Sequence, residues 1–446
     1  MKSGSVMNAP GNNNHRWKSA GARSLALHFR PARVPEKTLR YTHTFGLGGM
    51  AMVLVLMLFC TGLLLMFVYD PSPERAYQSV LLMQQEVLFG RLIRGTHYWS
   101  ANLLIAVTML HMLRVFLTGA FHGPRQSNWI AGLALMLLVL VSGFTGYLLP
   151  WDQLSYWAIT ICTEMLAYVP GIGLAVQRVV LGGTEIGPAT VINFYVTHTT
   201  MVPILLLVIM TWHFWRIRLA GGVVVPGDPQ EGLEIPTRYV PFAPNLLLKE
   251  TVVALILIAV VLVLAVAFGA PLGEPANPGI SPNPAKAPWY FLGFQELLLH
   301  FHPVFAVFVI PLVIAVGMIG IPYLRYDSQL SGNWFLTPRG RSMAIAAAGT
   351  ALLLTPLWIL LDEFVIGPGG WIPGAAPIIS NGLLPCAALL LGLAGFYTLL
   401  VKRFSASKNE AVQTLFILLI VAFTVLTVTG IWFRGENMGL VWPWQM

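Results

Sequence analysis

The chain has 446 residues, of which 56% are hydrophobic and only 10% are charged, and its formal net charge is +8. This composition excludes ordinary soluble and disordered proteins and is typical of integral membrane proteins. A charge of +8 could suggest nucleic acid as a partner, but its uneven distribution along the chain favours a lipid bilayer instead.

In chain order, residues 1–44 form a polar, basic tail without the apolar core of a cleavable signal peptide. Nine apolar stretches follow, each near the length that spans about 30 Å of hydrocarbon. They are predicted at residues 45–69, 97–121, 129–150, 189–215, 250–269, 303–324, 343–361, 380–401 and 411–433. The sequence therefore predicts an all-α, polytopic membrane protein: a four-helix bundle followed by about five further transmembrane helices.

Most of the 26 lysines and arginines fall in the tail and in the loops on the same side of the membrane. By the positive-inside rule this side is cytoplasmic, so the N-terminus is predicted to be cytoplasmic. A polar stretch at 220–247 is predicted as a linker on that side. On the opposite side, the loops 151–188 and 270–302 are long enough for structure of their own, and 74–95 is predicted as a surface helix.

Four histidines lie in two of the predicted spans, in matched pairs. His97 and His111 are 14 residues apart, and His198 and His213 are 15 apart. At 1.5 Å per residue, each pair is separated by roughly 21–22 Å along its helix, and both members face about the same way. Because imidazole is a common axial ligand of haem iron, two such helices side by side could hold one haem near each membrane face. A single membrane histidine is more often a packing residue or a proton relay.

Glycines on two other spans repeat the same interval: Gly48 and Gly62, and Gly132 and Gly146, are each 14 residues apart. A missing side chain allows a flat ring to approach the backbone closely, which predicts that these glycines pack against haem. Glycine also serves ordinary helix packing in membranes, which explains any one of them but not the shared spacing.

Two arginines flank the first histidine pair. Arg94 precedes His97 by three residues, and Arg114 follows His111 by three. Each is predicted to reach a haem propionate from a span end, although interfacial snorkelling would explain either residue alone.

Longer motifs resemble the cytochrome b of cytochrome bc complexes. The segment Thr145-Gly146-Tyr147-Leu148-Leu149-Pro150-Trp151 resembles the family's transition from the third span into the outer loop. Phe194-Tyr195, His198 and Pro203 match the start of its fourth span. Gly273-Glu274-Pro275-Ala276-Asn277-Pro278 resembles the version in oxygenic photosynthesis, where the protein is split into two subunits. The resemblance covers roughly residues 40–330.

This resemblance implies two b haems, with His97 and His198 holding the low-potential one at the outer side and His111 and His213 the high-potential one. It implies a division into a dihaem module (45–219), the linker (220–247) and a quinol-site module (248–330). Residues 331–446 are additional transmembrane helices of unassigned role. Cys60, Cys162 and Cys386 are isolated and no Cys-x-x-Cys-His occurs, so no covalent c-type haem is expected.

The segment Pro288-Trp289-Tyr290-Phe291 lines up with the family's Pro-Glu-Trp-Tyr motif at its outer quinol-oxidising site, to which we also assign Tyr147. In this chain Pro288 takes the place of the glutamate. Quinol oxidation releases two protons, which a proline cannot accept. Glu296 is the predicted substitute, with His300 or His302 as further candidates and a plain interfacial charge as the alternative.

At the inner side the family reduces quinone beside the high-potential haem. Lys249 and Glu250 resemble its Lys-Asp pair for proton uptake, and Arg218 stands at a position that lines this site in relatives. A positive-inside arginine is an equally good explanation of Arg218.

The sequence thus predicts the cytochrome b subunit of a quinol-oxidising complex in a bacterial cytoplasmic or related energy-transducing membrane. Quinol and quinone are its expected substrates. The family implies a Rieske iron–sulfur protein, a c-type cytochrome and homodimerisation. A dihaem anchor of a quinone-linked dehydrogenase, or a non-haem transporter subunit, are the alternatives.

Overall fold

The computed structural model describes residues 32–226, 238–327, 332–367 and 369–445. Parts of the predicted tail and linker lie outside these ranges. Within them, nine helical segments are long and apolar enough to cross a membrane, which confirms the predicted spans. They run over Leu47–Met66, Gly90–Leu117, Gly123–Leu148, Pro188–Leu219, Phe242–Ala267, Val304–Tyr323, Pro338–Ile366, Ile379–Lys402 and Lys408–Trp432.

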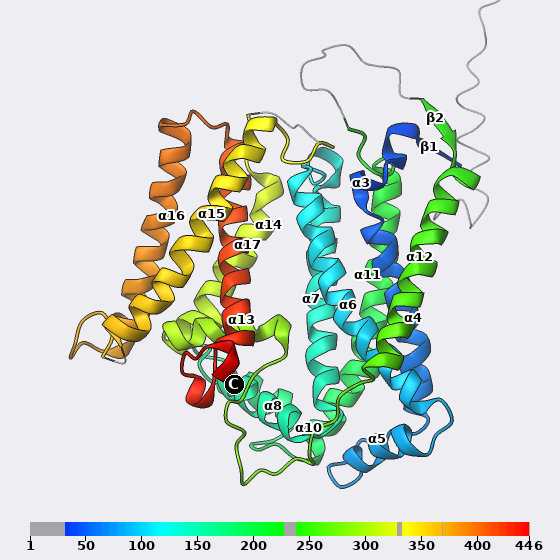
Figure 1. The fold of residues 1–446 in the computed structure, drawn as a ribbon, viewed down its shortest axis with the longest axis vertical. Helices are drawn as coiled ribbons and strands as arrows, with labels where there is room; N and C mark the ends of the chain where they lie inside the picture. Colours follow the sequence, from blue (N-terminus) through cyan, green and yellow to red (C-terminus); the bar gives the residue numbers. More distant parts are fainter. Residues whose placement is uncertain (1–31, 227–237, 328–331, 368, 446) are drawn as a thin grey trace, which may run out of the picture.

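The four histidines lie on segments of the first bundle, whose helices Figure 1 shows in blue to green. Its helices are α4 (Leu47–Met66), α6 (Gly90–Leu117), α7 (Gln126–Leu148) and α11 (Val202–Leu219). Leu54, Ile105 and Val139 are buried in its core. The helix α12 (Phe242–Ala267) packs on α6 and α4 through Val261, so part of the segment that the sequence assigned to the quinol-site module lies against the dihaem module.

The second bundle lies beside the first (Figure 1). It consists of α14 (Ile310–Gly320), α15 (Pro338–Leu361), α16 (Leu384–Lys402) and α17 (Lys408–Trp432), with α13 (Trp289–His300) at one end. An aromatic cluster joins the two bundles, because Phe116 of α6 packs against Phe416 of α17 with ring centroids 4.0 Å apart and ring planes inclined by 35°. Buried apolar contacts of this kind make the last three spans part of one packed structure.

Capping side chains begin several helices. Asp152 caps α8 (Gln153–Leu166), accepting a hydrogen bond from the Ser155 amide at 3.0 Å, and Ser407 caps α17 with Glu410 as its capping-box partner. Such caps satisfy amides that the first helical turn leaves free.

The fourth span contains a local widening of the helix. Between α10 (Pro188–Val196) and α11, residues Thr197–Met201 form a π turn that carries His198. Pro203 follows two residues later and has no N–H to donate. Single π turns are frequent at functional sites because they rotate one side chain out of the regular register.

On the side predicted to face outward (the outer side), the surface helix predicted at 74–95 is shorter than expected. The surface helix is α5, which covers only Ala76–Gln85, and the helix of the second membrane span already begins at Gly90. Phe89 takes a left-handed conformation (φ 59°), and a Cβ at Gly90 would collide with the backbone carbonyl of Met83. The chain therefore turns sharply here, as only glycine permits.

The remaining elements are short. On the opposite side, predicted to be the inner one, β1 (Arg33–Pro35) pairs antiparallel with β2 (Tyr239–Pro241), with Val34 opposite Val240. The other elements are α3 (Tyr41–Thr44), α9 (Gly173–Leu181), η1 (Glu36–Leu39), η2 (Gly123–Arg125), η4 (Val304–Val309), η5 (Ile321–Tyr323), η6 (Asp362–Ile366), η7 (Ile379–Leu383), η8 (Glu436–Met438) and η9 (Pro443–Gln445).

Candidate functional site

The outer histidine pair faces across the first bundle. The rings of His97 (α6) and His198 (the π turn) have centroids 6.2 Å apart and planes inclined by 70°. Two imidazoles that bind one metal ion from opposite sides, each with its nitrogen about 2 Å from the metal, need a separation of this order. The pair therefore fits an iron held between the two rings.

Hydrogen bonds orient both rings of this pair. His97 Nδ1 lies 2.9 Å from Thr61 Oγ1, and His198 Nδ1 lies 3.0 Å from the carbonyl oxygen of Ser142. The Nε2 atoms are then the ones left for a ligand. Partners of this kind at the second ring nitrogen hold metal-binding histidines in orientation.

The inner pair lies on the same two membrane spans, about four helical turns from the outer pair, with His111 on α6 and His213 on α11. His111 and His213 are close enough to interact electrostatically. The ring of His213 lies by the backbone of Asn128, which contributes a hydrogen bond to it.

Each predicted glycine lies against one of the four histidines. A Cβ placed on Gly62 or Gly48 would come within 3.2 Å of His97 and 3.3 Å of His111, respectively. On α7, a Cβ placed on Gly146 would come within 2.5 Å of His198, and one placed on Gly132 within 3.6 Å of His213. The glycine spacing thus matches the histidine spacing because each glycine leaves room for an imidazole ring.

The two arginines beside the histidines bond to protein atoms. Arg94 donates to the carbonyls of Ala270 at 2.9 Å and Pro271 at 2.7 Å. Arg114 donates to the carbonyl of His43 at 3.1 Å and lies 3.2 Å from that residue's Nε2. Both guanidinium groups are buried near the histidine levels, and their role toward propionates stays a prediction.

An apolar cavity of about 340 Å³ opens on the outer side between α8 and α13. Its lining includes Phe144, Trp157, Cys162, Lys286, Phe291 and Gln295. Volumes of a few hundred Å³ with mostly apolar walls and few polar groups are typical of small-molecule sites. Burial raises the pKa of the Cys162 thiol to about 11, so this side chain is neutral at physiological pH.

The structure separates the residues predicted for the outer quinol site. Trp289 turns toward α6 and donates from Nε1 to Asn102 at 2.7 Å. The buried Tyr290 packs against Gly143 of α7, near Tyr147. The cavity is lined instead by the flanking residues Ala287 and Phe291, so the motif borders the cavity from one side.

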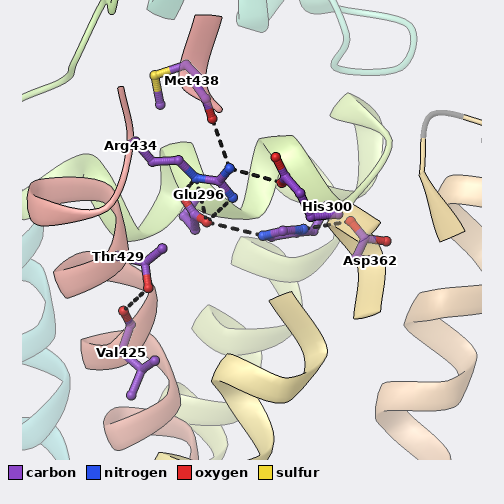
Figure 2. Close-up of polar contacts among 8 residues, drawn as sticks. Glu296, His300, Asp362, Val425, Thr429, Arg434 and Met438 are labelled. Carbon is purple, nitrogen blue, oxygen red and sulfur yellow. Dashed lines mark hydrogen bonds and ion pairs between the residues drawn. The ribbon is translucent and has the colours of Figure 1, made fainter. Parts of the chain in front are cut away.

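Glu296 lies in a buried ionic cluster and is not among the residues that line the cavity (Figure 2). Its carboxylate accepts from Arg434 Nη2 at 2.6 Å and from Nε at 3.1 Å, while His300 Nε2 lies 3.2 Å away. Arg434 also donates to Glu363 at 3.0 Å. Burial alone would raise the pKa of Glu296, but bonds from His300 and Arg434 hold that pKa below its usual value.

His300 bridges two carboxylates in this cluster. Its Nδ1 lies 2.7 Å from Asp362 Oδ2, opposite the contact with Glu296. Ionised carboxylates only accept hydrogen bonds, so both ring nitrogens donate and the ring is an imidazolium. Burial would lower the pKa of His300, but the bonds to Asp362 and Glu296 raise it above the ordinary value.

On the inner side, the predicted residues lie near the ends of α11 and α12. Arg218 Nη1 is buried and has no hydrogen-bond partner in the described part of the chain. Lys249 donates to the carbonyl of Leu39 at 2.7 Å. His43 contacts Arg114 and bonds to the carbonyl of Val224 at 2.8 Å. An unsatisfied buried guanidinium N–H suits an anionic or carbonyl ligand.

Sequence reasoning missed Lys286 and Gln295 in the cavity wall and Asp362, Glu363 and Arg434 in the cluster. One signal was available: Lys286 stands alone as a lysine in the proline-rich outer loop. Arg434 lies 138 residues after its partner Glu296, and Asp362 lies 62 residues after its partner His300, so no spacing rule connects them.

Comparisons with known proteins agree with this architecture. The sequence model of the family described as Cytochrome b/b6/petB matches residues 34–221. The chain is 42% identical over 188 residues to cytochrome b6 of Heliomicrobium gestii, which covers 42% of this chain and 87% of that protein. It is 35% identical over 276 residues to the "Cytochrome bc complex cytochrome b subunit" of Chlorobaculum thiosulfatiphilum, covering 61% of this chain and 63% of that protein.

A solved structure described as "Hyperthermophilic respiratory Complex III" superposes with a TM-score of 0.65 at 23% identity, covering 92% of this chain and 98% of the other. Because the superposition covers 92% of this chain, it supports the fold of both bundles. The fold and the paired histidines define a polytopic helical membrane protein of the haem-binding type. The chain belongs to the cytochrome b family.

Proposed function

We propose that this chain is the cytochrome b subunit of a bc-type, quinol-oxidising complex, with its N-terminus on the cytoplasmic side of a bacterial or related energy-transducing membrane. The observation that carries this proposal is that the rings of His97 and His198 face each other between two membrane helices, with their centroids 6.2 Å apart. A second pair lies deeper along the same helices. Membership in the cytochrome b family supports b haems as the groups that the pairs hold.

His97 and His198 would hold the outer haem, and His111 and His213 the inner haem. When bound, the two haems supply one-electron transfer across the bilayer, while the second electron of the quinol leaves to an outer acceptor. The chain's residues fix the geometry: Thr61 and the Ser142 carbonyl orient the outer rings, and the four glycines leave space for the imidazoles.

The outer cavity would bind quinol. Its walls, Phe144, Trp157 and Phe291, exclude water and suit a substituted aromatic ring. Glu296 stays the predicted proton acceptor, with the His300 imidazolium and the partly exposed Asp362 beside it. A Glu296→Gln variant tests this role, since unchanged quinol turnover would exclude it.

The inner quinone site would lie where Arg218 presents an unpartnered N–H group, with Lys249 and Glu250 of α12 for proton uptake. A guanidinium stabilises the charge that a quinone acquires on reduction. The complex would also contain a Rieske iron–sulfur protein and a c-type cytochrome as separate subunits, and two copies of this chain.

Haem quantification with a redox titration of the purified complex tests the proposal. We expect two b haems that titrate at different potentials and are reduced by added quinol. Replacing His198 with alanine should abolish the outer-haem signal and keep the inner one. A preparation without a b-type α band, or an intact two-haem spectrum in that variant, would exclude the assignment.

A further inference from the structure

We infer that the C-terminal hairpin of this chain (residues 433–441) positions one wall of the outer cavity, through a reciprocal pair of hydrogen bonds between Asn437 and Asn283. This inference rests on the proposed quinol site and makes Asn437 a positioning residue for quinol oxidation. Asn283 lies in the outer-cavity loop (residues 280–287), which contributes several residues to the cavity wall.

Backbone hydrogen bonds close the C-terminal hairpin. Arg434 pairs with Leu440 in an antiparallel bridge, and the Val441 amide donates to the Phe433 carbonyl at 3.0 Å. At the tip of the hairpin, Asn437 takes a left-handed conformation (φ 54°). Asparagine adopts this conformation more readily than most residues that carry a side chain, so the turn can be tight here without a glycine. The bridge thus fixes the tip relative to the end of α17.

A buried arginine anchors the hairpin to α13. Arg434, which is 1% exposed, donates from Nη1 to the Met438 carbonyl at 2.8 Å and from Nη2 to Glu296 at 2.6 Å (Figure 2). One guanidinium therefore bonds both to the turn of the hairpin and to the helix that carries other residues of the cavity wall. Charge-assisted hydrogen bonds of a planar guanidinium fix direction as well as distance, so the hairpin is held in one position.

The tip of the hairpin contacts the outer-cavity loop through two hydrogen bonds of opposite direction. The Asn437 amide donates to Asn283 Oδ1 at 2.6 Å, and Asn283 Nδ2 donates to Asn437 Oδ1 at 3.0 Å. Asn283 stands between Pro282 and Pro284, whose fixed φ angles make this part of the loop stiff. Because Pro282 lines the cavity, a displacement of Asn283 would also move the cavity wall.

Other contacts hold the end of the outer-cavity loop that leads into α13. The Gln295 side chain accepts from the Ala287 amide at 2.8 Å and donates to the Ala285 carbonyl at 2.7 Å. Lys286 Nζ donates to the carbonyl of Ile431, in the last turn of α17, at 3.1 Å. The pair of asparagines adds a contact at the middle of the loop. The C-terminal part of the chain thus holds the loop at two points.

The position of the loop should affect substrate binding more than chemistry. Pro282 and Ala285 offer apolar surface to the cavity and no group that could exchange a proton with a hydroquinone. Such a wall binds the substrate and the transition state about equally, so loosening it raises KM and leaves kcat nearly unchanged. A loop that is already in place also spares the substrate the entropy cost of ordering it.

A double-mutant cycle on the purified complex tests the inference, with a synthetic short-chain hydroquinone as substrate. Asn283→Ala removes both hydrogen bonds, and we expect KM to rise about twofold to tenfold at nearly unchanged kcat, as the net contribution of such bonds implies. Asn437→Gly keeps the left-handed backbone and its amide, so only the bond to Oδ1 is lost and the rise should be smaller. The double variant should resemble Asn283→Ala, because both substitutions act on one contact.

Two further variants serve as controls. Asn437→Asp keeps the backbone amide and a side-chain acceptor, so it should keep the wild-type KM. Gln445→Ala removes the side-chain oxygen that accepts from the Trp442 amide at 2.9 Å, a bond of the same C-terminal segment outside the hairpin, and should also leave KM unchanged. The haem content of each preparation measures how much folded complex it contains, so that kcat is counted per folded complex.

The possible outcomes differ clearly. If Asn283→Ala oxidises hydroquinone with the wild-type KM, the pair has no positioning role, although the proposed function stands. A loss of activity in proportion to haem content, at unchanged KM, would show that the pair only stabilises the fold, which also overturns the inference. So would additive effects of the two substitutions, because the residues would then act separately. If the wild type does not oxidise hydroquinone at all, the proposed function itself fails.

Discussion

At the scale of single residues, the close contacts between glycine and histidine determine how the first bundle is built. Each of the four histidine rings occupies the space that a glycine on the neighbouring helix leaves free. The sequence predicted these eight residues from two repeated intervals, because helical periodicity turns a 14-residue spacing into alignment on one face. The contact with the imidazole rings was not predicted, because spacing alone does not show which atoms a glycine meets. The packing of these glycines against haem stays a prediction.

Alanine at Gly146 should displace His198, because the new Cβ would come within 2.5 Å of His198 Cε1. Overpacking of this kind costs about 1–3 kcal/mol and shifts the ring from its position. We expect a broadened or reduced outer-haem signal and a lower thermal midpoint. The matched control is Gly132→Ala, whose Cβ would lie an ordinary 3.6 Å from His213. Equal effects of both substitutions would contradict this interpretation.

At the scale of elements, α13 is held between the cavity and the second bundle. One face carries Phe291 and Gln295 into the cavity wall, and another carries Glu296 and His300 into the ionic cluster. Gly293 allows α17 to approach, because a Cβ there would lie 2.7 Å from the side chains of Phe423 and Thr427. The position of the cavity wall therefore depends on contacts made by α17.

Removing one charge from the pair of Arg434 and Glu296 should destabilise this junction strongly. Arg434→Met leaves the Glu296 carboxylate buried without its main partner, and breaking such a pair costs about 3–5 kcal/mol. Replacing both residues, in Glu296→Gln with Arg434→Met, should recover most of that loss. Thermal unfolding of the two variants measures the difference. A double variant as unstable as the single one would show that the charge pairing is not the cause.

The cluster should also make stability depend on pH. The pKa of His300 is raised above its ordinary 6.5, so its contribution is complete below about 6.5 and is lost as the pH rises through the raised pKa. The pKa of Glu296 is lowered from 4.5, so its contribution is complete above about 4.5 and is lost as the pH falls through the lowered pKa. His300 and Glu296 therefore both contribute fully to stability between about pH 4.5 and pH 6.5.

The difference in thermal midpoint between the wild type and His300→Gln isolates the histidine's share. We expect this difference to be largest near pH 6 and to shrink toward alkaline pH, where the wild-type ring has lost its charge. A difference that grows with pH would mean that the ring is neutral in the folded protein.

At the scale of the whole molecule, the two bundles form one packed structure. The aromatic contact of Phe116 with Phe416 joins them toward the predicted inner side, and the bond from Trp289 of α13 to Asn102 of α6 joins them toward the predicted outer side. The histidine pairs lie at two depths of the first bundle, so their inner and outer assignment depends on the orientation of the chain.

The positive-inside distribution predicts that α9 and the following loop face the outer compartment. We expect Glu185→Cys, an exposed position after α9, to react with a membrane-impermeant maleimide in spheroplasts, and Arg403→Cys to react only after permeabilisation. The native cysteines provide the background, measured in the unsubstituted protein. Labelling in the reverse order would exchange the outer and inner assignments of the haems and of both quinone sites.

The sequence by itself determined the nine spans, the histidine pairs and the family, because hydropathy and helical periodicity are local properties of consecutive residues. Only the tertiary structure decided that α12 packs on the first bundle, that Glu296 pairs with Arg434, and that Lys286 lines the cavity. These facts depend on contacts between residues 138 or 145 positions apart, or between helices whose apolar surfaces look alike in lipid. Lipid offers no difference in hydrophobicity to choose between such surfaces, so shape and a few buried polar groups decide which helices meet.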